Sequence, residues 1–125
     1  MLQANWLKSK ALAVGWLMVM NILFVLPGSA LPKSNWMTDW HVDKWVHIGL
    51  FAVLIFLWCR AFEISAGKKL IVIISAIAYG ILVEVVQKTW VPNRSFDLYD
   101  VAADAAGSLI GLFVWLRVKE KNKPL

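Results

Sequence analysis

The chain has 125 residues, which is room for a single domain. It is 60% hydrophobic with a mean hydropathy of +0.65, and a soluble domain of this size could not bury so much apolar surface. The net charge of +5 does not indicate a nucleic-acid-binding protein, because lysine and arginine cluster at the ends of apolar runs and form no continuous basic stripe.

The first predicted membrane span covers residues 9–27, and Lys8 and Lys10 flank its apolar core. Basic residues, an apolar run and a small-residue segment ending at Ala30 also resemble a secretory signal with a cleavage site after Ala30. The apolar run is long for a signal, which favours a retained span.

The second and third spans are predicted at residues 43–60 and 69–90. Each is apolar over most of its length and carries polar residues near one end, His47 in the second and Glu84 in the third. Cys59, the sole cysteine, lies in the second span, so an intramolecular disulfide and a thiolate metal cage are excluded.

The fourth span is predicted at residues 97–117, although its uncharged run has only 12 residues, 105–116. A bilayer core needs about 20 helical residues. The helix must therefore begin near Asp97 and carry Asp100 and Asp104 toward or into the membrane. The sequence thus predicts an all-α, integral membrane four-helix bundle.

The distribution of basic residues predicts that both the N-terminus and the C-terminus are cytoplasmic. With the N-terminus inside, nine basic residues fall on the inner side: Lys8, Lys10, Arg60, Lys68, Lys69, Arg117, Lys119, Lys121 and Lys123. The four that fall on the outer side are Lys33, Lys44, Lys88 and Arg94.

This topology brings polar residues from three helices to the outer end of the bundle. Asp97, Asp100 and Asp104 follow one another at spacings of three and four, so they share one helical face, which Gly107 and Gly111 continue. Small residues at such spacing allow another helix to approach closely, so this face is expected to contact protein.

The predicted cluster holds more negative than positive charge. Its five carboxylates, against Lys44 and Arg94, are Asp43, Glu84, Asp97, Asp100 and Asp104. Five negative minus two positive charges leaves −3 if all ionise, so either some carboxyls carry protons or a cation or cationic ligand lies among them. A functional cavity is the preferred interpretation, and a self-satisfied network that only locks the helices together is the alternative.

Taken together, these residues resemble the VanZ-like membrane proteins. The motifs that carry the resemblance are Asp43-Lys44-x-x-His47, Tyr79-Gly80-x-x-x-Glu84-x-x-Gln87, Pro92-x-Arg94-Ser95-x-Asp97-x-x-Asp100 and Gly107-x-x-x-Gly111. The resemblance implies one four-helix domain over residues 1–125, a multi-pass location in the bacterial cytoplasmic membrane, and a site made of Asp43, Lys44, His47, Glu84, Gln87, Arg94, Asp97 and Asp100. Asp104 is a departure, since the family often has Asn there. The family's namesake is associated with low-level teicoplanin resistance.

The first functional hypothesis is an envelope role, in which the site engages an outer-leaflet lipid or a lipid-linked cell-wall component. Arg94 would hold a phosphate in a bidentate grip and Lys44 would add a point charge. His47, Glu84 and Asp100 are candidate acid–base groups, although His47 serves equally well as a packing residue. Enzyme activity is not favoured, because no serine or cysteine nucleophile with a matching base is evident; if present, it would be that of a hydrolase or transferase acting on a lipid phosphate.

The alternatives are a small cation- or proton-binding protein and a scaffold for other membrane proteins. Asp43, His47, Glu84 and Asp100 could offer ligands to a divalent ion, but their spacing is not diagnostic, so no metal or other cofactor is predicted. The expected partners are membrane lipids, with no nucleic acid. Transport through so narrow a bundle would require an oligomer.

Overall fold

The computed structural model describes residues 2–27, 36, 41–92 and 96–122, with side chains from residue 8 onward. The described residues form four long helices and one short 3-10 turn, with no strand among them. The helices are α1 (Leu2–Val25), α3 (Val42–Phe62), α4 (Lys69–Trp90) and α5 (Leu98–Lys121), and the turn η2 (Ala66–Lys68) leads into α4. The prediction of an all-α four-helix fold is confirmed.

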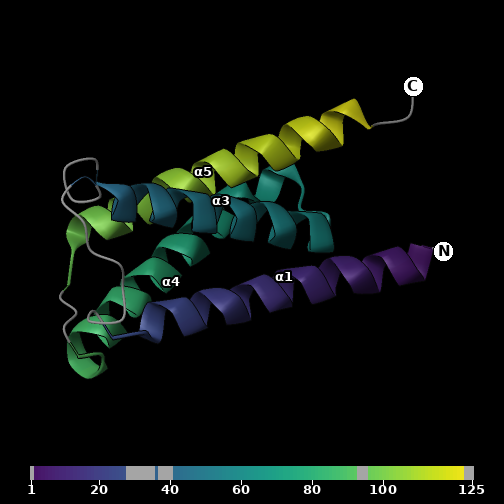
Figure 1. Cartoon of the computed structure of the whole chain (residues 1–125). Coiled ribbons are helices and arrows are strands. Elements are labelled where there is room, and N and C mark those ends of the chain that lie inside the picture. The colour runs from purple at the N-terminus through teal and green to yellow at the C-terminus, as the bar shows by residue number, and fades with distance from the viewer. Residues whose placement is uncertain (1, 28–35, 37–40, 93–95, 123–125) are drawn as a thin grey trace.

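The chain runs up and down through the bundle, so α1 begins and α5 ends at the same end (Figure 1). Four candidate spans of 18, 21, 25 and 24 residues follow the helices, the third of them including η2, and each is long and apolar enough to cross a membrane. Many large apolar side chains point outward, among them Met18, Leu70 and Phe113, which are 61%, 68% and 64% exposed. Such an apolar exterior suits a lipid environment and not water.

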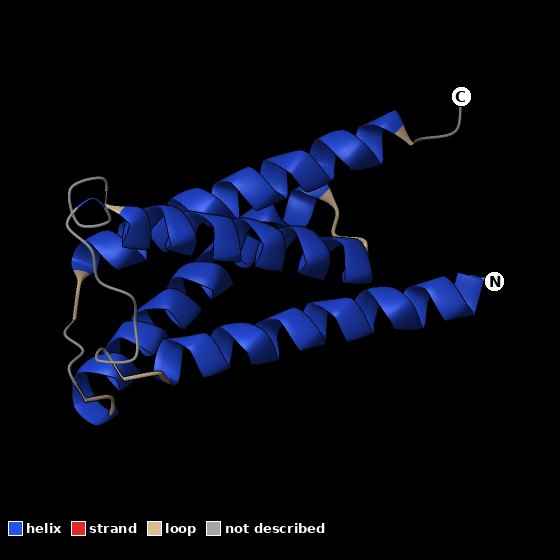
Figure 2. Ribbon diagram, viewed as in Figure 1, coloured by secondary structure: helices blue, strands red, loops and turns tan. Residues whose placement is uncertain are grey.

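The ends of the helices have local causes. Figure 2 shows that the described non-helical segments are short and lie at the ends of the helices. α1 ends at Val25, two residues before Pro27, because a residue that precedes proline is driven out of helical conformation. α3 ends in a Schellman motif in which Glu63 adopts a left-handed conformation, and the backbone N–H of Ile64 donates to the carbonyl of Cys59 at 3.0 Å. α5 begins after Asp97, whose carboxylate accepts a hydrogen bond from the backbone N–H of Tyr99 at 2.9 Å.

The closest packing in the bundle joins α3 to α5, which make the most extensive helix–helix contact in the described structure. Two glycines of α5 allow it. A Cβ added at Gly107 would lie 2.2 Å from the carbonyl oxygen of Ile48, and one at Gly111 would lie 2.3 Å from that of Ala52. The stripe of small residues predicted to face another helix therefore faces the backbone of α3.

Hydrogen bonds from tryptophan side chains to backbone carbonyls also hold the bundle together. The indole Nε1 of Trp16 on α1 donates to the carbonyl of Leu50 on α3 at 3.0 Å. At the end of the bundle away from the acidic residues, the indole of Trp115 on α5 donates to the carbonyl of Ile64 at 2.8 Å. Phe51, with no exposed surface, lies in the apolar core between these helices. α3 and α5 thus form the central pair, on which α1 and α4 pack.

Candidate functional site

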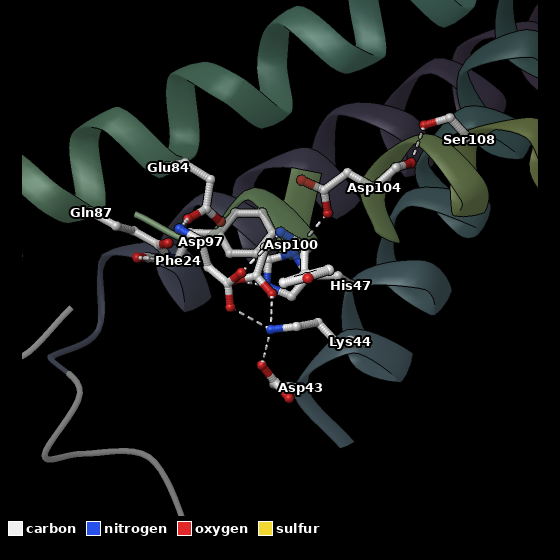
Figure 3. Close-up of polar contacts among 11 residues, drawn as sticks. Phe24, Asp43, Lys44, His47, Glu84, Gln87, Asp97, Asp100, Asp104 and Ser108 are labelled. Atoms are coloured by element: carbon white, nitrogen blue, oxygen red, sulfur yellow. Dashed lines mark hydrogen bonds and ion pairs between the residues drawn. The ribbon is translucent and has the colours of Figure 1, made fainter. Parts of the chain in front are cut away.

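The outer part of the site is a cluster around the ammonium of Lys44, near the first turn of α3 (Figure 3). Its Nζ donates to Asp43 Oδ2 at 2.5 Å, to Asp97 Oδ2 at 2.6 Å and to Asp100 Oδ1 at 2.7 Å. A lysine ammonium has three N–H groups, so the three carboxylates occupy all of its donors. Lys44 therefore links α3 to the beginning of α5 and has no donor left for a phosphate.

The inner part of the site centres on His47, one turn further along α3. Its Nδ1 lies 2.7 Å from Asp104 Oδ1, and its Nε2 lies 3.7 Å from Asp100 Oδ2. His47 is buried and Asp104 has no exposed surface. The ring of Phe24 on α1 covers the imidazole, with the ring centroids 5.3 Å apart. The imidazole is therefore held between a carboxylate of α5 and an aromatic ring of α1.

Glu84 brings the third helix, α4, into the same site. Its side chain is fully buried, and its Oε2 accepts a hydrogen bond from the backbone N–H of Asp97 at 3.1 Å. Glu84 Oε1 and Asp104 Oδ2 are buried without a hydrogen-bond partner among the described residues. Asp104 Oδ2 lies against Gly80, where an added Cβ would be only 2.7 Å away. Two carboxylate oxygens thus lack the partner that buried polar atoms normally have.

The side-chain amide of Gln87 donates to the backbone of another helix and not to a carboxylate of the site. Its amide Nε2 donates to the backbone carbonyl of Phe24 at 3.0 Å, and the residue is 2% exposed. This bond ties the end of α4 to the end of α1. Arg94, which the sequence predicted as a second cation of the site beside Lys44, lies outside the described residues.

The charges of the described site do not balance. The described residues of the site include one ammonium and five carboxylates, those of Asp43, Glu84, Asp97, Asp100 and Asp104, so their formal charge is −4 with His47 neutral and all carboxyls ionised. The sequence had placed these residues together, and the structure brings all five into one continuous set of contacts. A charge of this size near or in a membrane requires bound protons or a bound cation.

Sequence reasoning missed two residues of the site. Ser108, fully buried on α5, donates its hydroxyl to the carbonyl of Asp104 at 2.7 Å. Phe24 both covers His47 and accepts the hydrogen bond from Gln87. Ser108 follows Asp104 by one helical turn, which is a detectable signal for such a bond. Phe24 stands in an apolar run and has no distinguishing signal.

The contact between Asp97 and Lys44 predicts a pH dependence of stability. The neighbouring ammonium lowers the pKa of Asp97 below its ordinary value of 3.8, so the ionised form stabilises the folded protein above that pH, and this contribution is lost as the pH falls through the lowered pKa. Asp97→Asn is expected to destabilise the protein by up to about 1 kcal/mol at neutral pH, since the side chain is partly exposed.

Thermal unfolding of both proteins in detergent, from about pH 6 down to about pH 3, measures this difference. The gap between Asp97→Asn and the unmodified protein should be constant at the upper end and close below about pH 4. Asn retains the cap at the start of α5, so the comparison isolates the charge. A difference in stability between the two proteins that does not change with pH would contradict the prediction. The control is Glu120→Gln, which changes an exposed glutamate of α5.

Comparison with known proteins supports the relationship that the motifs indicated. The family model described as VanZ/LLP1 matches residues 4–119, which is nearly the whole chain and includes every residue of the site. Neither a curated protein nor a solved structure matches the chain. Because the family match spans all four helices, the chain belongs to the VanZ/LLP1 family and is a multi-pass membrane protein.

Proposed function

We propose that this protein acts at the bacterial cell envelope by binding, in its acidic site, the headgroup of an outer-leaflet lipid or a lipid-linked cell-wall component. The observation that carries the proposal is the charge of the described part of the site, which holds five carboxylates and one ammonium where α3 and α5 begin and α4 ends. An excess of negative charge favours a cationic ligand.

The depth of the site supports a headgroup as the ligand. Trp45 lies beside Lys44, and Trp90 is the last residue of α4; they are 67% and 72% exposed. Exposed tryptophans gather at the level of lipid headgroups. The positive-inside pattern of the sequence predicts that this end of the bundle lies on the outer side of the membrane.

The sign of the charge favours an amine over a phosphate as the recognised group. Lys44, expected to contact phosphate, instead donates to Asp43, Asp97 and Asp100. An ammonium group of a lipid or of a lipid-linked peptide would reduce the negative charge and could donate to Glu84 Oε1, which has no hydrogen-bond partner among the described residues.

Lipid binding tests the proposal directly. The purified protein is exchanged into phosphatidylethanolamine or phosphatidylglycerol and examined by native mass spectrometry, with an amine-bearing lipid-linked cell-wall precursor as a third arm. We expect retention of an amine-bearing lipid and at least about tenfold weaker retention by Glu84→Gln, a loss of about 1.4 kcal/mol for one charged hydrogen bond. The matched control, Glu120→Gln, changes an exposed glutamate of α5 and should bind as the unmodified protein does.

Preference for phosphatidylglycerol, or equal retention by Glu84→Gln, would overturn the proposal. In cells, the corresponding test compares teicoplanin susceptibility of strains that produce Glu84→Gln and Glu120→Gln at equal protein levels. An envelope role at this site predicts that only Glu84→Gln changes susceptibility.

One observation favours a second candidate, a purely structural network. The ammonium of Lys44 and the backbone N–H of Asp97 together connect α3, α4 and α5 through hydrogen bonds. A scaffold that uses the network only for assembly predicts that Glu84→Gln lowers thermal stability and leaves lipid retention unchanged. The two measurements therefore separate the candidates.

A further inference from the structure

We propose that His47, Glu84 and Asp100 bind a divalent transition-metal ion. The three residues come from α3, α4 and α5, and each offers one ligand atom such that all three atoms lie within 4.8 Å of one another. Spacing along the chain did not indicate a metal, because the ligands come from three separate helices and only the fold brings them together. The inference does not rest on the proposed lipid function, and a metal ion at Glu84 would be an alternative to the lipid ammonium there, not an addition to it.

Glu84 has a buried carboxylate oxygen with no hydrogen-bond partner among the described residues, and this oxygen points to a ligand at that position. The oxygen is Oε1, and Glu84 has no exposed surface. In Figure 3 its side chain extends from α4 toward Asp100 and His47. A buried carboxylate oxygen that accepts no hydrogen bond is costly unless a proton or a cation neutralises it.

The imidazole of His47 is oriented as metal-binding histidines are. An ionised Asp104 can only accept a hydrogen bond, so Nδ1, at 2.7 Å, would carry the proton, and in the neutral imidazole Nε2 would then present a lone pair. Nε2 faces Asp100 Oδ2 at 3.7 Å, which is too long for a hydrogen bond. Metal-binding histidines usually donate one ring N–H to a carboxylate or carbonyl and direct the other ring nitrogen at the metal.

The chemistry of the ligands selects the class of ion. One imidazole and two carboxylates suit Zn²⁺ or Mn²⁺ better than Mg²⁺, which prefers oxygen ligands and retains its waters. Ligands at about 2.0–2.2 Å from a tetrahedral ion lie about 3.3–3.6 Å apart, so ligand atoms that lie within 4.8 Å of one another need to close by at most about 1.5 Å. Three protein ligands leave a coordination position open to water or to a bound group.

The acidic group around Lys44 is a different case. Asp43, Asp97 and Asp100 also have ligand atoms within 4.8 Å of one another. The ammonium of Lys44 already occupies the space among them, at 2.5–2.7 Å from each carboxylate. We assign the metal only to the set that contains His47.

Metal binding by the purified full chain tests the proposal. The protein is treated with a chelator, dialysed against Zn²⁺, Mn²⁺ or Mg²⁺ separately, and examined by elemental analysis and calorimetry. We expect one equivalent of Zn²⁺ or Mn²⁺ per chain, with Mg²⁺ bound more weakly. Glu84→Gln should abolish stoichiometric binding, and Asp104→Asn, which changes a positioning residue, should weaken it about 10–100-fold.

Glu63→Gln and Glu120→Gln are matched controls, since both glutamates are exposed and lie away from the site. Size-exclusion profiles and melting temperatures establish that each variant is folded. If Glu84→Gln does not fold, Asp100→Asn serves as the ligand variant in its place. Failure of the unmodified protein to bind either transition metal stoichiometrically, or equal Kd values for it and the folded ligand variant, would overturn the proposal. Lipid retention by the chelator-treated protein shows separately whether the proposed function stands.

Discussion

Gly107→Ala is expected to lower the free energy of unfolding by about 3 kcal/mol, the upper end of the usual cost of overpacking. The added methyl group would lie 2.2 Å from the carbonyl oxygen of Ile48 and 2.9 Å from its Cα. Both are backbone atoms, so no side-chain rotation can relieve the clash, and α3 and α5 must move apart. Thermal unfolding in detergent, followed by tryptophan fluorescence, measures the loss.

Gly49→Ala provides the matched control for this substitution. Gly49 lies in the neighbouring helix α3, and a Cβ added there would meet nothing within 4 Å. Its melting temperature should stay at the original value or rise slightly, because alanine favours a helix over glycine. Equal melting temperatures for Gly107→Ala and Gly49→Ala would show that the close contact between α3 and α5 does not exist.

Lys44→Met is expected to destabilise the protein by about 2–3 kcal/mol, somewhat less than the cost of breaking a fully buried ion pair. The substitution removes the ammonium that lies within 2.7 Å of Asp43, Asp97 and Asp100 and leaves their like charges facing one another. The Lys44 side chain is 20% exposed, so water moderates the effect. Chemical or thermal unfolding at neutral pH measures it.

Two further variants make this result specific. Lys44→Arg retains the positive charge and should recover most of the stability, although its planar group fits three separate carboxylates less well than an ammonium. Lys88→Met removes an exposed lysine of α4, near the end of the bundle where Lys44 lies, and should change the melting temperature little. If Lys44→Met and Lys88→Met were equally stable, the cluster around Lys44 would not contribute to the fold.

The fold could be predicted because the bilayer imposes simple lengths on the sequence. The uncharged run of the last helix was too short to span, and this shortage placed its beginning near Asp97; the structure begins α5 at Leu98 and uses Asp97 as the cap. The pairing of helices could not be predicted in the same way. Gly107 and Gly111 indicated that another helix approaches α5, but their spacing contains no information about which one.

The composition of the site was more predictable than its contacts. Helical spacing placed Asp100 and Asp104 on one face, and the topology brought Glu84 to them. Asp97, which was expected on the same face, is instead the N-cap, in extended backbone just before α5. The sequence could not show that one ammonium donates hydrogen bonds to three carboxylates, because this depends on side-chain conformations at the junction of two helices. The cytoplasmic location of both termini stays a prediction from the basic residues.

The hydrogen bonds of Lys44 and His47 also have a consequence for the order of biosynthesis. Their partners Asp97, Asp100 and Asp104 follow them by 53, 56 and 57 residues along the chain. During synthesis, α3 is made and leaves the ribosome before α5 has been made. The two polar residues therefore enter the membrane ahead of most of their counter-charges, and the arrival of the last helix is the step that completes the bundle.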